Sequence, residues 1–178
     1  MSITVAKSAG FCFGVNRAIN IVNSLLDKNV KVSTLGPIIH NMEVVNELES
    51  RGCKAVDNID EVEKDATLVI RSHGVPKYVI DKLDENGVKY KDATCPFVKK
   101  IHNIVANPDN KDGIVLIAGN SVHPEVEGII GHCSTECHTF KNSEEIDEIY
   151  NNVLKKNNKQ VFVVAQTTFD TKEWKKCV

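Results

Sequence analysis

The sequence lacks both a long apolar run and an excess of positive charge. No stretch of the 178 residues approaches the roughly 18 apolar residues that a membrane-spanning helix needs, so we expect no membrane contact. The net charge is −2, which argues against a nucleic-acid-binding surface because such surfaces are normally basic. The opening segment, MSITVAKSAG, has no apolar core of the kind found in signal peptides. We therefore expect a cytoplasmic protein.

Low-complexity segments and flexible linkers are also missing. Hydrophobic residues make up 42% of the chain, which is enough for a packed core without a disulfide scaffold. In the cytoplasm the six cysteines are expected to stay reduced unless they bind metal or take part in redox chemistry.

Short β-rich runs alternate with amphipathic helical patterns along the chain. GVNRAINIVNSLL has helical spacing, whereas ITVA, KVSTLG, ATLVIRS and GIVLIAGN are typical of strands, and KQVFVVAQ of a buried strand. PKYVIDKLDEN is expected to be a helix with Pro76 in its first turn, and Asp170 with Glu173 predicts a capping box. The alternation predicts an α/β protein with mainly parallel sheets.

We predict a domain boundary near residue 95. Residues 1–13 would form an N-terminal strand ending in the first cysteine turn, 14–95 a first α/β domain, and 96–178 a second. The last helical pattern stops at Val178, so we expect the chain to be a fragment.

Four strand-to-helix junctions share polar residues at the end of the strand. They carry His40, His73, His123 with Glu125, and Thr167 with Thr168. Ligands of open α/β sheets bind beyond the carboxyl ends of the strands, and helix N-termini there attract anions, phosphates above all. Any one histidine is equally well explained as a tolerated loop residue. The recurring set suits an acidic ligand such as a diphosphate, with Glu125 as a candidate proton donor.

Cys12 and Cys95 occupy matching turns, in AGFCFGV and DATCPFV. Thiolates hold iron–sulfur clusters, and zinc is the other metal that fits cysteine and histidine ligands. Cys53 is expected to be a small core residue and Cys177 an ordinary helix residue. The segment GHCSTECH, which contains His132, Cys133, Cys137 and His138, is an alternative zinc site.

Taken together, these segments resemble the LytB/IspH family, 4-hydroxy-3-methylbut-2-enyl diphosphate reductases of the non-mevalonate isoprenoid pathway. The matching pieces are, in order, AGFCFGVNRAI, LGPIIHN, IRSHGVP, DATCPFV, GNSVHPEVEG and VAQTT. The resemblance implies a trefoil of small α/β domains around a central [4Fe–4S] cluster, with two of three lobes present here. Cys12 and Cys95 match two of the three cluster cysteines.

The resemblance also implies roles for the polar junctions. The family's diphosphate-binding histidines match His40, His73 and His123. Its proton-relaying glutamate matches Glu125, and its substrate-hydroxyl threonine matches Thr167. The implied enzyme is an oxidoreductase that removes the allylic hydroxyl with two electrons and two protons, giving isopentenyl and dimethylallyl diphosphates. A ferredoxin- or flavodoxin-like protein would supply the electrons.

The family pattern is incomplete in this chain. The third cysteine and a Ser-x-Asn phosphate motif are expected well beyond the QTT segment, yet the chain ends ten residues after Thr168. Cys177 lies too early, and in a helical pattern, to replace that cysteine. We therefore expect the fragment to be inactive on its own. The alternative functions are a zinc-binding module and a non-catalytic α/β protein that binds a phosphate ligand.

Overall fold

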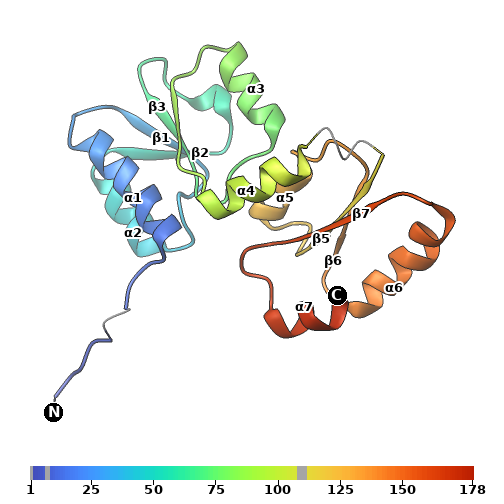
Figure 1. The fold of residues 1–178 in the computed structure, drawn as a ribbon. Helices are drawn as coiled ribbons and strands as arrows, with labels where there is room; N and C mark the ends of the chain where they lie inside the picture. Colours follow the sequence, from blue (N-terminus) through green and yellow to red (C-terminus); the bar gives the residue numbers. More distant parts are fainter. Residues whose placement is uncertain (1, 7–8, 108–111) are drawn as a thin grey trace. The chain divides into compact units, whose positions relative to one another are not determined.

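Residues 2–6, 9–107 and 112–178 are described by a computed structural model (Figure 1). They form two compact units. The first holds the described residues up to Ser72 together with Lys89–Cys95, and the second holds His73–Val88 and the described residues from Pro96 to Val178. Each unit contains a parallel sheet, which confirms the predicted α/β class. Within the described ranges no helix combines the length and the hydrophobicity needed to cross a membrane.

The sheet of the first unit has the strand order β2-β1-β3-β4, and every pairing is parallel. Its strands are β1 (Val32–Leu35), β2 (Cys53–Val56), β3 (Thr67–Ile70) and β4 (Tyr90–Asp92), and its helices are α1 (Phe13–Leu26), α2 (Met42–Ser50) and the 3₁₀ turn η1 (Ile59–Glu61). Val22 of α1 and Leu48 of α2 belong to one buried cluster with Val32, Val69 and Cys53. Cys53 is therefore the core residue that the sequence predicts.

The boundaries of α2 follow from its sequence. The Asn41 side chain accepts a hydrogen bond from the backbone N of Val44 at 3.1 Å and so caps the helix. After the helix, Gly52 adopts a φ of 97°, a left-handed conformation that favours glycine. The chain can therefore turn directly from α2 into β2.

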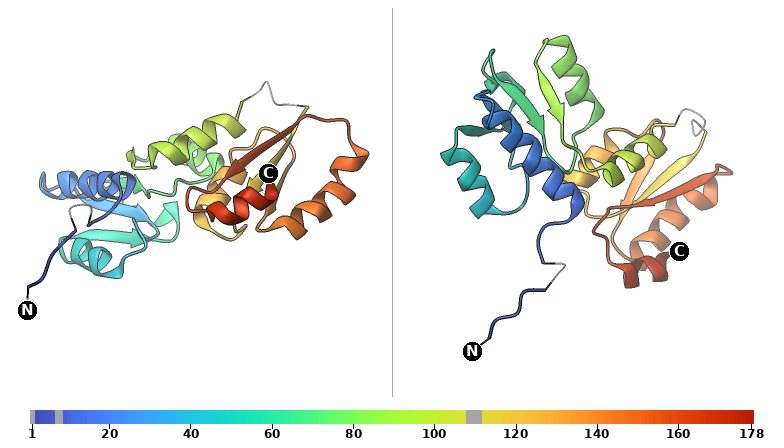
Figure 2. Two further views of the ribbon diagram at one scale, coloured as in Figure 1. Left: turned by 60° about the horizontal axis from the view of Figure 1, so that its bottom comes forward. Right: turned by 60° about the vertical axis from the view of Figure 1, so that its left-hand side comes forward.

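The second unit has a three-stranded sheet with β5 in the centre of the order β6-β5-β7. Its strands are β5 (Ile114–Ala118), β6 (Cys137–Phe140) and β7 (Val161–Ala165); its helices are α3 (Lys77–Glu85), α4 (Pro96–Val105), α5 (Pro124–Ile130), α6 (Ser143–Asn152), the 3₁₀ turn η3 (Leu154–Lys156) and α7 (Thr171–Cys177). One buried cluster joins α4 and α5 to Val115 and Ile117 of β5, and another joins α6 and α7 to Ile114 and Leu116. The sheet is thus covered on both faces, as the views in Figure 2 show.

One predicted strand does not form, and another forms with less burial than predicted. Residues 3–6 are described and form no strand, and the side chains of Ile3 and Val5 are 91% and 75% exposed. A strand of this length needs a neighbour to complete its hydrogen bonds, and the described residues supply none. Residues 1, 7 and 8 of the predicted N-terminal segment lie outside the described residues. The strand β7 forms as predicted, but it is only partly buried: Val164 lies in the core, whereas Val161 and Val163 are 37% and 38% exposed because β7 is an edge strand of the described sheet.

Two helix starts also differ in detail from the sequence-based expectation. Pro76 is the N-cap of α3 and not a residue of its first turn. At α7, Asp170 accepts hydrogen bonds from the backbone N of Lys172 at 2.7 Å and of Glu173 at 3.0 Å, which is the capping half of the predicted box. Glu173 instead pairs with Lys176 at 2.5 Å, so its carboxylate is directed along the helix.

Candidate active site

The first unit brings the first turn of α1 against Cys95. Cys12 is the exposed N-cap of α1, and Cys95 follows β4 and precedes α4. A Cβ atom added at Gly14 would lie 2.6 Å from Cys95 Sγ and 3.0 Å from Cys95 Cβ. Only glycine permits so close an approach, so the glycine two residues after Cys12 sets the distance between α1 and Cys95.

Further polar contacts hold the segment that carries Cys95. Arg17, in the second turn of α1, donates to the carbonyl oxygens of Asp92 and Thr94, both at 3.2 Å. The Cys95 backbone N donates to the carbonyl of Ser72 at 2.9 Å, and Ser72 N lies 3.4 Å from the carbonyl of Ile38. The ends of β3 and β4 and the loop after β1 are thus tied together by backbone hydrogen bonds.

His40 lies in that loop after β1. Ile38 and Ile39 are both 2% exposed and anchor the loop in the core, whereas His40 is exposed just before the N-cap of α2. The arrangement matches the predicted strand-to-helix junction, with the imidazole at the surface where a ligand could reach it.

Cys12 and Cys95 have the chemistry expected of ligands of an iron–sulfur cluster. Cys12 and Cys95 are thiols at helix starts, one exposed and one partly exposed, and thiolates are the usual protein ligands of iron–sulfur clusters. Over the described ranges, no three or more cysteine, histidine, aspartate or glutamate side chains gather into a metal site. The two thiols could therefore serve as ligands of an iron–sulfur cluster, but they do not form a complete ligand set by themselves.

In the second unit, Glu125 and Thr167 meet although 42 positions separate them in sequence. The backbone N and the hydroxyl of Thr167 donate to the two carboxylate oxygens of Glu125, at 2.6 Å and 2.8 Å. Glu125 is 2% exposed, whereas Thr167 is exposed. A carboxyl group buried in this way has both oxygens fixed, and it lies directly beside a hydroxyl that solvent can reach.

His123 and His73 lie beside each other in the same unit. His123 is the N-cap of α5, and its Nδ1 accepts a hydrogen bond from the backbone N of Glu125 at 3.1 Å. Because Nδ1 accepts, Nε2 carries the ring proton and can donate it to a ligand. The rings of His73 and His123 are 5.6 Å apart, edge to face. The structure thus brings His73 and His123 together. Glu125 lies two residues after His123, on α5, and contacts Thr167.

Several residues that the sequence analysis missed hold α5 in place. A Cβ at Gly128 would lie 3.3 Å from Nε2 of His102, and one at Gly131 would lie 2.3 Å from the Cβ of Pro76. A Cβ at Gly119 would lie 2.7 Å from a methyl group of Val126. These glycines allow α5 to pack closely against its neighbours. The only sequence signal was the glycine in HPEVEGIIGH, which is uncommon within a helix.

The QTT turn is held by Gln166. This side chain is 9% exposed, its amide donates to the Thr168 hydroxyl at 2.9 Å, and its backbone N donates to the carbonyl of Ala118 at 2.8 Å. Thr168, which the sequence analysis placed at this junction, therefore stabilises the turn, while Thr167 contacts Glu125.

The alternative zinc site does not assemble among the described residues. His132 Nδ1 contacts the carbonyl of Gly128 at 2.9 Å, and its ring stacks on that of His102 with centroids 4.0 Å apart. His138 pairs with Glu136 at 2.9 Å. Of the four predicted ligands, Cys133 donates its thiol to the carbonyl of Ile129 at 3.4 Å, and the two histidines have the partners just named.

Comparison with known proteins decides the family. The family model described as "LytB protein" matches residues 3–178. The chain belongs to the LytB family. Among curated LytB relatives, the 4-hydroxy-3-methylbut-2-enyl diphosphate reductase of Clostridioides difficile (strain 630) is 40% identical over 171 residues, and that of Alkaliphilus oremlandii (strain OhILAs) is 42% identical over 175 residues. In both cases the match covers 96% of this chain and 60% of the relative, so the chain spans about 60% of their length.

Solved LytB-family structures are similar as well. A structure of (E)-4-hydroxy-3-methyl-but-2-enyl diphosphate reductase, described as the terminal enzyme of the non-mevalonate pathway, has 37% identity and a TM-score of 0.82, covering 99% of this chain and 62% of its own. The E-1-hydroxy-2-methyl-but-2-enyl-4-diphosphate reductase from Plasmodium falciparum has 29% identity and a TM-score of 0.83, covering 96% of this chain and 53% of its own. The family resemblance that the sequence motifs indicate is confirmed.

Proposed function

We propose that this chain provides the first two α/β units of a 4-hydroxy-3-methylbut-2-enyl diphosphate reductase that acts in the cytoplasm. The observation that carries the proposal is the buried Glu125 carboxyl group fixed by Thr167, with His123 capping the same helix. The family match and the reductase names of the relatives support the same reaction.

In this reaction the allylic C–O bond breaks, the oxygen leaves as water, and the carbon takes up a proton, so that two electrons and two protons are consumed. His40, His73 and His123 would bind the diphosphate through ring N–H groups. Thr167, whose hydroxyl donates to the Glu125 carboxylate, would orient the substrate hydroxyl. Once protonated, Glu125 would donate to the Thr167 oxygen, and the Thr167 hydroxyl would pass its own proton to the substrate hydroxyl.

Cys12 and Cys95 would hold a [4Fe–4S] cluster together with a cysteine outside this chain. When bound, the cluster would supply the electrons one at a time, and a ferredoxin- or flavodoxin-like protein would reduce it. Phe11 and Phe13, which flank Cys12, would limit the access of water, and Gly14 would keep α1 against Cys95.

A chimera tests this proposal. Residues 1–178 would replace the matching 60% of the Clostridioides difficile relative, and the protein would be prepared without oxygen and supplied with reduced viologen and the allylic diphosphate. We expect a brown protein that forms both diphosphate products, a Glu125→Gln variant that binds substrate but hardly turns over, and no activity from residues 1–178 alone. An active chimera without iron would refute the cluster, and normal turnover by Glu125→Gln would remove Glu125 from the proton path.

A further inference from the structure

A groove lies between α1 and the edge strand β4 in the first unit, and we call it the α1–β4 groove. Its volume is about 540 Å³. Lys91 of β4 forms one side, and the other lining residues belong to α1 or, in the case of Lys28, follow it directly. Part of the lining is apolar: Phe13, which is 64% exposed, and the partly buried Ile21 and Leu25. The groove therefore offers apolar surface that a partner protein could cover.

The charged residues that line the α1–β4 groove are all basic. They are Arg17, Lys28 and Lys91, and among the described residues no aspartate or glutamate joins them in the lining. Arg17 donates to the carbonyl oxygens of Asp92 and Thr94, and its guanidinium group stays positively charged in these contacts. The chain as a whole has a net charge of −2. The groove is thus a local concentration of positive charge in a chain with more acidic than basic residues.

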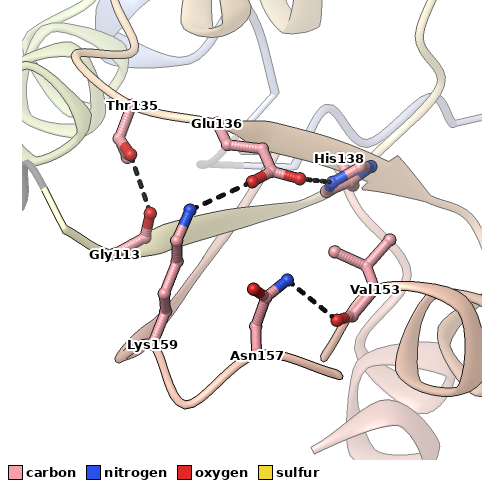
Figure 3. A network of polar contacts seen from close by, with 7 residues as sticks. All are labelled: Gly113, Thr135, Glu136, His138, Val153, Asn157 and Lys159. Carbon is pink, nitrogen blue, oxygen red and sulfur yellow. Dashed lines mark hydrogen bonds and ion pairs between the residues drawn. The ribbon is translucent and has the colours of Figure 1, made fainter. Parts of the chain in front are cut away.

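The two lysines of the α1–β4 groove keep their charges available for a partner. Lysines elsewhere pair with acids, for example Lys159 with Glu136 at 3.4 Å in the network that Figure 3 shows. No ion pair within the described part of the chain includes Lys28 or Lys91, and both residues are exposed. Carboxylates of another protein could therefore approach both ammonium groups from solvent.

The α1–β4 groove begins beside Cys12. Cys12 is the N-cap of α1, and Phe13, the next residue, lines the groove. Because a helix rises about 1.5 Å per residue, Asn20, which also lines the groove, lies about 12 Å from Cys12 along the helix axis. Under the proposed function Cys12 is a ligand of the cluster. A protein seated in the groove would therefore be next to the group that it has to reduce.

We propose that the α1–β4 groove is the docking site of the electron donor, a small acidic carrier protein that gives up one electron per encounter. The inference rests on the proposed function, which places the cluster at Cys12 and Cys95. Carboxylates of the carrier would pair with Lys28 and Lys91, and an apolar side chain would cover Phe13. Each turnover takes two electrons, so a carrier must bind, be oxidised and leave twice. A small charged interface suits this, because charges at the rim of an interface raise the association rate more than the affinity.

Charge reversal in the chimera tests the docking site, with an acidic bacterial ferredoxin as the probe. Lys54 and Lys91 are exposed lysines on the two opposite edge strands of one sheet, so Lys54→Glu is the matched control for Lys91→Glu. At low ionic strength we expect Lys28→Glu combined with Lys91→Glu to raise the calorimetric Kd for ferredoxin roughly tenfold and to flatten its dependence on salt. Lys54→Glu should leave the Kd close to that of the unmodified chimera. Equal Kd values for Lys54→Glu and Lys91→Glu would overturn the proposal.

Reduced viologen separates the docking site from the proposed function. Viologen is a small molecule that needs no protein docking site, so the double variant should keep its iron content and its viologen-driven activity, while its ferredoxin-driven activity falls roughly tenfold at low ionic strength. An unmodified chimera without viologen-driven activity would contradict the proposed function, and the ferredoxin Kd values would still test the groove. If ferredoxin binds the 178-residue chain but not the chimera, the rest of the reductase covers the groove and the docking site is refuted.

Discussion

Thr167 holds both carboxylate oxygens of Glu125, one through its backbone N at 2.6 Å and one through its hydroxyl at 2.8 Å. The two residues follow the neighbouring parallel strands β7 and β5, whose register pairs Ala118 with Ala165. Because parallel strands end at the same edge of a sheet, the two loops meet there. The contact between a buried acid and an exposed hydroxyl therefore depends on strand register.

Removing the hydroxyl from Thr167 should weaken both the fold and the reaction. Thr167→Val keeps the shape of the side chain but leaves one oxygen of the buried Glu125 without this donor, so we expect a loss of about 1–3 kcal/mol in the free energy of unfolding. Urea unfolding of the 178-residue chain measures this. Thr167→Ser retains the hydroxyl and should stay close to wild type in stability. Equal stability of the valine and serine variants would contradict the role of the hydroxyl.

His123 has two roles that substitution can separate. Its side chain caps α5, and asparagine is among the best capping residues, whereas alanine costs about 1 kcal/mol at such a position. We expect His123→Asn to keep the stability of the chain and His123→Ala to lower it. In the chimera, both variants should raise KM for the allylic diphosphate at least tenfold, because both lose the Nε2–H donor. An unchanged KM in His123→Asn would exclude His123 from diphosphate binding.

Adding a methyl group at Gly14 should disturb Cys95. The new Cβ would lie 2.6 Å from Cys95 Sγ, so α1 or Cys95 must shift, at a cost of about 1–3 kcal/mol in the free energy of unfolding. We expect Gly14→Ala to lower the iron content of the chimera at least twofold. Asn20→Ala, at an exposed position of the same helix, is the matched control and should keep its iron. Full iron loading in Gly14→Ala would show that this close contact is not needed.

The stability of the first unit should depend on alkaline pH through Cys53. Burial, and to a smaller extent the charge of Glu49, raises the pKa of Cys53 to about 11. An unfolded cysteine ionises at about pH 8.5, so the unfolded state loses its proton first as the pH rises. The contribution of Cys53 is thus fully present below pH 8.5 and decreases between about pH 8.5 and 11.

Urea unfolding at several pH values checks the effect of Cys53. The difference in unfolding free energy between the wild type and Cys53→Ala removes the lysine and tyrosine titrations that both proteins share. This difference should fall as the pH rises from 8.5 to 11. A constant difference over that range would mean that Cys53 titrates as it does in the unfolded chain.

Local patterns in the sequence were enough to predict most elements and the position of each polar junction. The cap at Asn41 and the turn at Gly52 are encoded within a few residues, so they could be recognised without the fold. The exposure of β7 could not be predicted in this way, because an apolar segment has the same composition whether it forms a central strand or an edge strand. Only the order of the strands in the sheet shows that β7 lies at an edge.

The contacts that define the site are of another kind. Glu125 and Thr167 are 42 positions apart in the sequence. Gly14 and Cys95, which are in contact, lie near opposite ends of the sequence that forms the first unit. Such contacts cannot be predicted from spacing in the sequence, because the distance between the two residues depends on the order of the strands and on how closely α1 and α5 pack. The side chain of His102 is 5% exposed and contacts Gly128, yet in the sequence it is one histidine in a helical pattern.

The turn between η3 and β7 can change in length without moving either Glu125 or Thr167. The register of the two strands is set by their own pairing, and η3 with the turn before β7 lies largely at the surface. Surface turns of this kind accept insertions. A label or affinity tag placed between Asn157 and Asn158 should leave the acid–hydroxyl contact intact, which makes this turn a practical attachment point for spectroscopy or immobilisation.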